Sequence, residues 1–105
     1  MKPLGTTYRK NGFHYEIIRR EGLIAIAQQR LAPGRGCLAF EVIKIRECPE
    51  ANFAGTIVPA HESAPGNEEW GNRGWTFPTI ERATAKFEAL VAADIAKFDA
   101  SLAEP

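Results

Sequence analysis

The sequence has few cysteines, no long apolar run and no net charge, and these shortages exclude several classes of protein. The two cysteines form no C-x-x-C pair, and with the two histidines they have no zinc-ligand spacing. No uninterrupted apolar run is longer than five residues, the length of the run from Leu23 to Ala27, which is far too short to cross a bilayer. We therefore expect free thiols, no metal, no cofactor and no membrane-spanning segment.

Catalytic signatures are also missing. There is no P-loop and no G-x-G-x-x-G, and Gly34-Arg35-Gly36 precedes a strand-like run, which is the wrong context for a dinucleotide turn. Cys37 or Cys48 could be combined with His14 or His61 as nucleophile and base, but any chain with two of each permits this combination. The first residues carry a lysine without an apolar stretch behind it, unlike a secretory signal. These features predict a cytoplasmic protein that is not an enzyme.

What the sequence does contain is the balance of an ordinary globular domain. Hydrophobic residues make up 45% of the 105 residues and charged residues 25%, so we expect residues 1–105 to form a single domain. The charges are uneven: residues 1–46 carry nine basic groups against three acidic ones, and residues 47–105 carry four against ten. This asymmetry indicates either charged partners or two parts of one fold that neutralise each other.

Short strand-like runs separated by turn signals fill the first half of the chain. Asn11-Gly12 is a strong hairpin signal, because a type I′ turn needs a positive φ at both central positions. Connections this short join antiparallel neighbours, since parallel strands need crossovers of about a dozen residues or more. In the fourth run Glu41 interrupts a face that is otherwise apolar. The predicted strands are residues 6–10, 13–20, 23–30 and 37–46.

The second half holds a weaker strand signal, a long loop and a helix. Residues 53–58 could form a fifth strand, residues 59–74 are typical of a loop, and residues 75–77 could be a brief return strand. Thr79 is a suitable N-cap for a helix over residues 80–98 with a frayed tail to the last residue. Its apolar positions recur at three- and four-residue steps: Ile80, Ala83, Phe87, Leu90, Val91, Ile95 and Phe98. The sequence thus predicts an α+β fold, a four- to five-stranded antiparallel meander with one C-terminal helix packed on one face.

The loop before the helix carries the residues most typical of a binding site. Trp70 and Trp75 lie five residues apart around two glycines, and tryptophan is enriched at binding hot spots. Both indoles could instead anchor the loop on the core. If the loop binds a partner, we expect Trp70 to be at least partly exposed. The candidate protein-binding residues are His61, Glu68, Glu69, Trp70, Arg73 and Trp75.

The segment Trp70-Gly71-Asn72-Arg73-Gly74, followed by Ala83 and Phe87 in the helix, resembles the W-G-R-x-G signature of WGR domains. Those domains run from strands into a helix with an A-x-x-x-F pattern and bind nucleic acid, so the resemblance implies a nucleic-acid contact at Arg73. It covers the last third of the chain. Here the third motif position is Asn72, and the arginine is displaced by one.

The layout of the whole chain is also similar to small uncharacterised proteins of phage and prophage genomes. Those proteins often end in the same order of an Asn-Glu-x-Trp-Gly segment, a Gly-Trp-Thr segment and a closing helix with alanine and phenylalanine. The matching residues are Asn67, Glu68, Trp70, Gly71, Gly74, Trp75 and Thr76. This resemblance implies a phage association and no particular activity.

The basic residues of the first half offer an alternative interface. They stand at strand ends or away from the apolar face, with Tyr8 and His14 near enough in sequence to stack on bases. They could also form a solvated face whose charges protect the sheet edges against aggregation. These residues are Arg9, Lys10, Arg19, Arg20, Arg30, Lys44 and Arg46. The sequence thus predicts a non-enzymatic binding module for a protein partner, with nucleic-acid binding through the basic face as the alternative.

Overall fold

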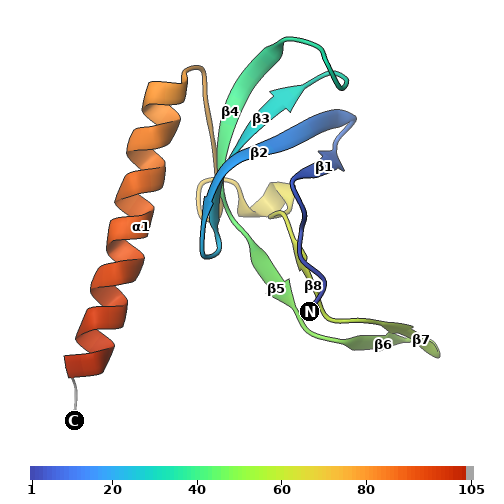
Figure 1. The fold of residues 1–105 in the computed structure, drawn as a ribbon. Coiled ribbons are helices and arrows are strands. Elements are labelled where there is room, and N and C mark those ends of the chain that lie inside the picture. Colours follow the sequence, from blue (N-terminus) through green and yellow to red (C-terminus); the bar gives the residue numbers. More distant parts are fainter. Residues whose placement is uncertain (104–105) are drawn as a thin grey trace.

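The main body is a five-stranded antiparallel sheet with one helix, α1 (Ile80–Ala103), packed on it (Figure 1). The computed structural model describes the backbone of residues 1–103 and the side chains of residues 1–97. The strands of this sheet are β1 Thr7–Lys10, β2 Phe13–Glu21, β3 Ile24–Arg30, β4 Cys37–Lys44 and β9 Gly74–Phe77. They lie in the order β1-β2-β3-β4-β9, and each neighbouring pair is antiparallel. The predicted α+β fold is confirmed, and the brief return strand is the fifth strand.

The first hairpin forms as its sequence predicts. Asn11 and Gly12 have φ angles of 53° and 80°, which makes them the two left-handed residues of a type I′ turn. The turn sets the register of β1 against β2, so that Tyr8 pairs with Tyr15. Residues that pair directly across two strands share one face of the sheet. The hairpin therefore places both tyrosines on the face that α1 does not cover.

The predicted apolar stripe of α1 covers the other face of the sheet. Ala83 and Phe87 have no exposed surface, and they pack with Ile26 and Val42 of the two central strands. Burying a side chain the size of Phe87 stabilises the fold by about 1.5–3 kcal/mol. At the start of the helix the Thr79 hydroxyl accepts a hydrogen bond of 3.3 Å from a main-chain N–H of the first turn, as expected of an N-cap.

The helix is longer than the sequence indicates. It continues to Ala103 without the fraying predicted after residue 98, because residues 99–103 include no glycine or proline that would end it. Its second half projects past the sheet, and Ile95 is exposed there (Figure 1). The side chain of Phe98, the last predicted member of the stripe, and residues 104–105 lie outside the described residues.

Residues 46–63 leave the sheet as an arm (Figure 1). Its root consists of β5 (Arg46–Cys48) paired with β8 (His61–Ser63), and its tip of β6 (Ala51–Phe53) paired with β7 (Thr56–Val58). The prediction of one strand over residues 53–58 was therefore wrong. The chain reverses at Ala54-Gly55, where both residues have a positive φ, of 51° and 86°. Gly55 suits such a turn, but alanine is seldom left-handed, so Ala54-Gly55 lacks the Asn-Gly or Asp-Gly pair that signals a hairpin.

Two further predictions are corrected around the arm. The strand predicted over residues 37–46 divides, because β4 ends at Lys44 and the chain bends at buried Ile45 into the arm. The loop predicted over residues 59–74 contains β8 and the short 3-10 helix η1 (Asn67–Glu69). The segment between β4 and β9 thus contains four short strands and a 3-10 helix rather than one long loop.

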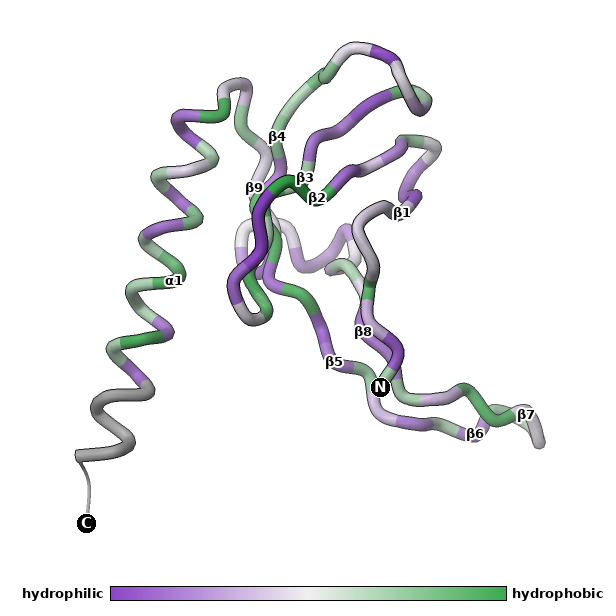
Figure 2. The backbone as a smooth tube through the Cα atoms, in the orientation of Figure 1, coloured by the Kyte–Doolittle hydropathy of each residue, from purple (hydrophilic) through white to green (hydrophobic). Residues whose placement is uncertain are grey.

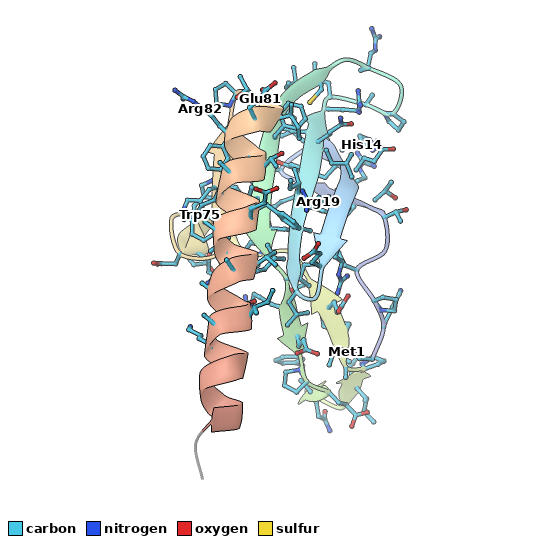
Figure 3. The ribbon with its side chains drawn as sticks, turned by 60° about the vertical axis from the view of Figure 1, so that its left-hand side comes forward. Met1, His14, Arg19, Trp75, Glu81 and Arg82 are labelled. Carbon is cyan, nitrogen blue, oxygen red and sulfur yellow. The ribbon has the colours of Figure 1, made fainter. Side chains whose placement is uncertain are left out.

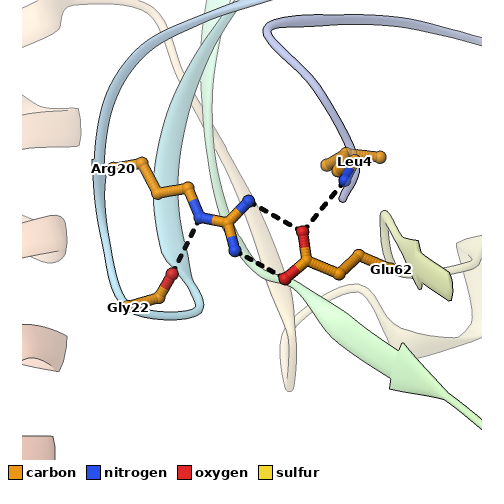
Figure 4. A network of polar contacts seen from close by, with 4 residues as sticks. All are labelled: Leu4, Arg20, Gly22 and Glu62. Atoms are coloured by element: carbon orange, nitrogen blue, oxygen red, sulfur yellow. Dashed lines mark hydrogen bonds and ion pairs between the residues drawn. The ribbon is translucent and has the colours of Figure 1, made fainter. Parts of the chain in front are cut away.

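An ion pair fixes the root of the arm to the sheet (Figure 4). Arg20 donates hydrogen bonds of 2.9 and 2.7 Å to the two carboxylate oxygens of Glu62 in β8, and one of 2.8 Å to the carbonyl of Gly22. The same carboxylate accepts a hydrogen bond of 2.9 Å from the main-chain N–H of Leu4. The bidentate pair with Arg20, together with the Leu4 donor, lowers the pKa of Glu62 to about 2. The network therefore joins β2, β8 and the N-terminal segment.

Candidate functional site

A polar pocket opens on the face of the sheet that the helix leaves uncovered. We call it the Glu41 pocket, after its buried carboxylate, and its volume is about 300 Å³. The pocket is lined by Lys10, Asn11, Phe13, Tyr15, Gln29, Glu41, Asn67, Trp70 and Thr76. All five strands of the main sheet and the turn around Trp70 contribute to it. Polar groups from distant parts of the sequence therefore converge on one concave surface, which is a common property of ligand sites.

Strand register brings the polar residues of the pocket together. Tyr15 of β2 pairs directly with Gln29 of β3, and Glu41 of β4 pairs directly with Thr76 of β9. Side chains of directly paired residues lie about 5 Å apart on one face. The Gln29 amide accordingly donates a hydrogen bond of 3.0 Å to the Tyr15 hydroxyl. The sheet thus positions the polar residues around Glu41.

Glu41 is the most unusual group in this pocket, because its residue is 5% exposed and carries a carboxylate. One oxygen, Oε2, accepts hydrogen bonds from the hydroxyls of Tyr15 and Thr76. Each distance is 3.4 Å, which is long for a hydrogen bond between oxygens. No ion pair among the described residues includes Glu41. Burial raises the pKa of its carboxyl above the usual range, and the positive charge of Lys10 partly opposes this shift.

Trp70 forms a wall of the pocket and is partly buried. Its indole N–H donates a hydrogen bond of 3.0 Å to the Thr76 hydroxyl. Its six-membered ring lies against Gly74, where an added Cβ would come within 2.4 Å of the ring, so only glycine fits. The Lys10 ammonium lies 4.1 Å from the centroid of the indole, in the position of a cation–π contact. Trp70 is therefore both packed on the sheet and open to the pocket.

Tyr8 lies beside the pocket. Its ring stacks on that of Tyr15, with centroids 4.9 Å apart and planes 9° from parallel. The Tyr8 hydroxyl is buried and has no hydrogen-bond partner among the described residues. Burial, with a smaller contribution from the negative charge of Glu41, raises the pKa of Tyr8 well above its usual range. This side of the sheet therefore buries two polar groups, the Tyr8 hydroxyl and the Glu41 carboxylate, with few or long hydrogen bonds to replace those with water.

The six predicted protein-binding residues do not form one site. Trp75 lies on the helix side of the sheet, where the Lys86 ammonium is 4.2 Å from its ring centroid (Figure 3). Trp70 packs on the opposite face. The Glu69 carboxylate forms ion pairs with Arg46 at 2.6 Å and with Arg73 at 3.3 Å, and these contacts fix the turn before β9. The remaining two are Glu68, which is exposed in η1, and His61, which lies in β8 of the arm.

The predicted basic residues are also divided between surfaces. Arg19 lies 4.6 Å from the ring centroid of Phe87 and 3.6 Å from Glu88, both on α1 (Figure 3). Arg20 is paired with Glu62 on the other side of the sheet, as shown above. Lys10 lies over the Trp70 ring, Arg46 pairs with Glu69, and Arg30 donates hydrogen bonds to Gln28 and the carbonyl of Arg35. Arg9 is exposed on β1, and Lys44 is partly buried at the end of β4.

A second candidate surface is the tip of the arm. Phe53 is 66% exposed and Ile57 is 63% exposed. Phe53 pairs with Thr56, and Ile57 pairs with Asn52, so the two large side chains stand on opposite faces of the hairpin. Figure 2 shows the apolar colour at this end of the arm, far from the sheet. The hairpin therefore presents apolar surface on both of its faces.

The sequence analysis missed the Glu41 pocket, although one signal for it was present. Glu41 interrupts an apolar strand face, and a charge at such a position marks either a paired ion or a functional group. Nothing in the sequence linked Glu41 to Gln29 or Thr76, because strand register is a tertiary property. The arm tip was missed because its turn has alanine where a hairpin turn usually has asparagine, aspartate or glycine.

Comparisons with known proteins add no relative: no family model, curated protein or solved structure matches the chain. No helix in the part of the chain that the structure describes combines the length and apolar character needed to cross a membrane. Within the same residues, no three His, Cys, Asp or Glu side chains gather as a metal site. The fold and its surfaces define a small α+β protein with a protruding arm and a polar pocket.

Proposed function

We propose that the protein is a non-enzymatic binding module whose arm docks on a protein partner. One observation carries this proposal, the exposure of Phe53 and Ile57 on the two faces of the hairpin β6–β7. Exposing apolar side chains of this size to water is unfavourable, and covering them with a partner lowers the free energy. His61, one of the predicted protein-binding residues, lies in β8 at the root of the same arm.

The shape of the arm supports this proposal. A two-stranded hairpin by itself is marginally stable in water, and its outer edges carry main-chain N–H and C=O groups that a further strand can pair with. The arm is anchored at its root by the pair between Arg20 and Glu62, so the tip is presented in a defined direction. A partner could therefore add a strand to an edge of the arm while it covers the apolar side chains.

The test compares two double variants in affinity capture from nuclease-treated lysate. Phe53→Ser with Ile57→Ser removes the apolar tip, and we expect the capture of a defined partner to be lost. The control is Leu31→Ser with Leu38→Ser, because these side chains are 61% and 51% exposed and lie away from the arm, directly after β3 and at the start of β4. We expect the control to capture the partner like the unmodified protein.

Stability measurements separate a binding effect from misfolding. Exposed side chains away from the core change stability by about 0.5 kcal/mol or less, so both double variants should unfold like the unmodified protein. Equal capture by the two double variants would contradict the proposal. A partner that is captured only from untreated lysate, with capture that falls steeply with salt, would replace the proposal by nucleic-acid binding.

A further inference from the structure

The Glu41 pocket contains a buried carboxylate without a counter-ion. Buried acids in proteins are nearly always paired with a cation or hydrogen-bonded closely, since an isolated charge out of water is costly. Glu41 has two long hydrogen bonds on Oε2, and no hydrogen bond to Oε1 is present among the described residues. The carboxylate faces a pocket of about 300 Å³, which leaves room for a group that would supply the missing positive charge.

The walls of the pocket favour a planar cation. Phe13, Tyr15 and Trp70 are among the residues that line the pocket, and cations bind to aromatic rings by cation–π attraction. A guanidinium group is planar, stacks on aromatic rings and donates two parallel hydrogen bonds to a single carboxylate. It is also weakly hydrated, which lowers the cost of moving it from water into the pocket.

Lys10 shows why an ammonium is less suited to the pocket. Its ammonium lies 4.1 Å from the Trp70 ring centroid, yet it forms no ion pair with Glu41. An ammonium is strongly hydrated and stays near solvent where a guanidinium would enter. Lys10 therefore covers the indole face that a ligand would use, and its charge opposes the entry of a second cation.

We propose that the Glu41 pocket is a binding site for an alkylguanidinium group, such as an arginine side chain, which pairs with Glu41 and displaces Lys10 from Trp70. The proposal goes beyond the function proposed above. The pocket and the arm share no residue, so the two proposals can fail separately.

The experiment is a titration of the folded protein with N-acetyl-arginine amide over millimolar concentrations, followed by NMR of the two indole N–H groups. The N–H of Trp70, which is bonded to Thr76, should shift and saturate, while that of Trp75 on the opposite face should stay unchanged. N-acetyl-citrulline amide has nearly the same shape without the charge and should not bind. N-acetyl-lysine amide should bind more weakly than the arginine probe.

Two variants should change the affinity in opposite directions. Glu41→Gln keeps the shape of the side chain and should weaken binding of the arginine probe by about tenfold or more, as expected for a lost charged hydrogen-bond partner. Lys10→Met should strengthen it by about threefold or more, because it removes a like charge and uncovers Trp70. The matched control is Lys86→Met, since Lys86 stacks on Trp75 as Lys10 stacks on Trp70.

Several results would overturn the proposal. These are no saturable shift at Trp70 in either the unmodified protein or the folded Lys10→Met variant, citrulline binding as strong as arginine binding, or no effect of Glu41→Gln. Lysine binding as strong as arginine binding would overturn the guanidinium assignment. If the arginine probe binds as expected, titration with methylguanidinium identifies the source of the guanidinium group. Tighter binding of the arginine amide points to a peptide chain, and equal binding points to a small molecule.

Discussion

The two faces of the main sheet are completed in different ways. On the helix face, Phe87 closes a fully buried apolar cluster with Ile26 and Val42. The other face contains a pocket that Glu41 and Trp70 line together with polar side chains. Since neighbouring residues of a strand point to opposite faces, the same five strands supply both surfaces. The comparison indicates that apolar packing alone closes the helix face, while the other face combines a second buried apolar cluster with a polar pocket.

The largest effect is expected on the helix face. Phe87→Ala should lower the free energy of unfolding by about 3–5 kcal/mol, because it removes a completely buried ring and leaves a cavity. Denaturant unfolding measures the loss. Ile95→Ala, an exposed position of the same helix, serves as the control and should stay within about 0.5 kcal/mol. A loss below about 1 kcal/mol at Phe87 would show that α1 does not close this face.

A smaller loss is expected at Trp70 on the pocket face. Trp70→Ala should lower the free energy of unfolding by about 2–3 kcal/mol, since the ring packs on Gly74 but is only partly buried. Trp70→Phe retains most of the packing and should lose about 1 kcal/mol with the hydrogen bond to Thr76. If Trp70→Ala stayed within about 1 kcal/mol of the unmodified protein, the residue would be a binding group and not an anchor.

Removing the charge of Glu41 should stabilise the protein. The folded pKa of Glu41 is raised, so above its ordinary value of 4.5 the folded state holds a proton that the unfolded chain has released. Stability is therefore lost as the pH rises from this value through the folded pKa. Glu41→Gln should remove that loss and gain about 1 kcal/mol at neutral pH, the scale of one poorly satisfied buried group. Unfolding curves at a series of pH values measure this. A destabilised Glu41→Gln variant at neutral pH would contradict the interpretation.

Glu62 should show the opposite pH dependence, because its folded pKa is lowered to about 2 from 4.5. Its contribution to stability is present above pH 4.5 and is lost as the pH falls towards 2. Glu62→Gln should therefore be less stable than the unmodified protein at neutral pH and nearly equal to it at pH 2. Unfolding curves of both glutamine variants on one pH series test this reversal directly. If both variants changed the free energy of unfolding in the same direction at neutral pH, the contrast between the two carboxylates would be contradicted.

Part of the fold could be predicted from the sequence for local reasons. The Asn11-Gly12 turn and the apolar stripe from Ile80 to Val91 depend on residue types at short spacing, and both are found in the structure. The arm could not be predicted in the same way. Its turn at Ala54-Gly55 places alanine in a left-handed conformation that this residue type rarely adopts. A single strand was the simplest interpretation of that segment, and it was wrong.

The candidate site was less accessible to sequence reasoning than the fold. The loop composition drew attention to Trp70 and Trp75 together, but β9 separates them onto opposite faces of the sheet. The residue that defines the pocket, Glu41, was visible as a charge on an apolar strand face. Its partners Tyr15 and Thr76 lie 26 and 35 positions away, so only strand pairing brings them to it.

The sequence by itself determined the α+β class, the antiparallel hairpins and the apolar stripe of the helix, because turn types and periodic burial are encoded within a few neighbouring residues. Only the tertiary structure decided which strand completes the sheet, where residues 46–63 extend as an arm, and which polar groups meet at Glu41. Strand order and register join residues that are far apart in the chain, and shifting one strand by a single position would move its side chains to the other face. The alternation along β4 places Val42 in the core and Glu41 in the pocket.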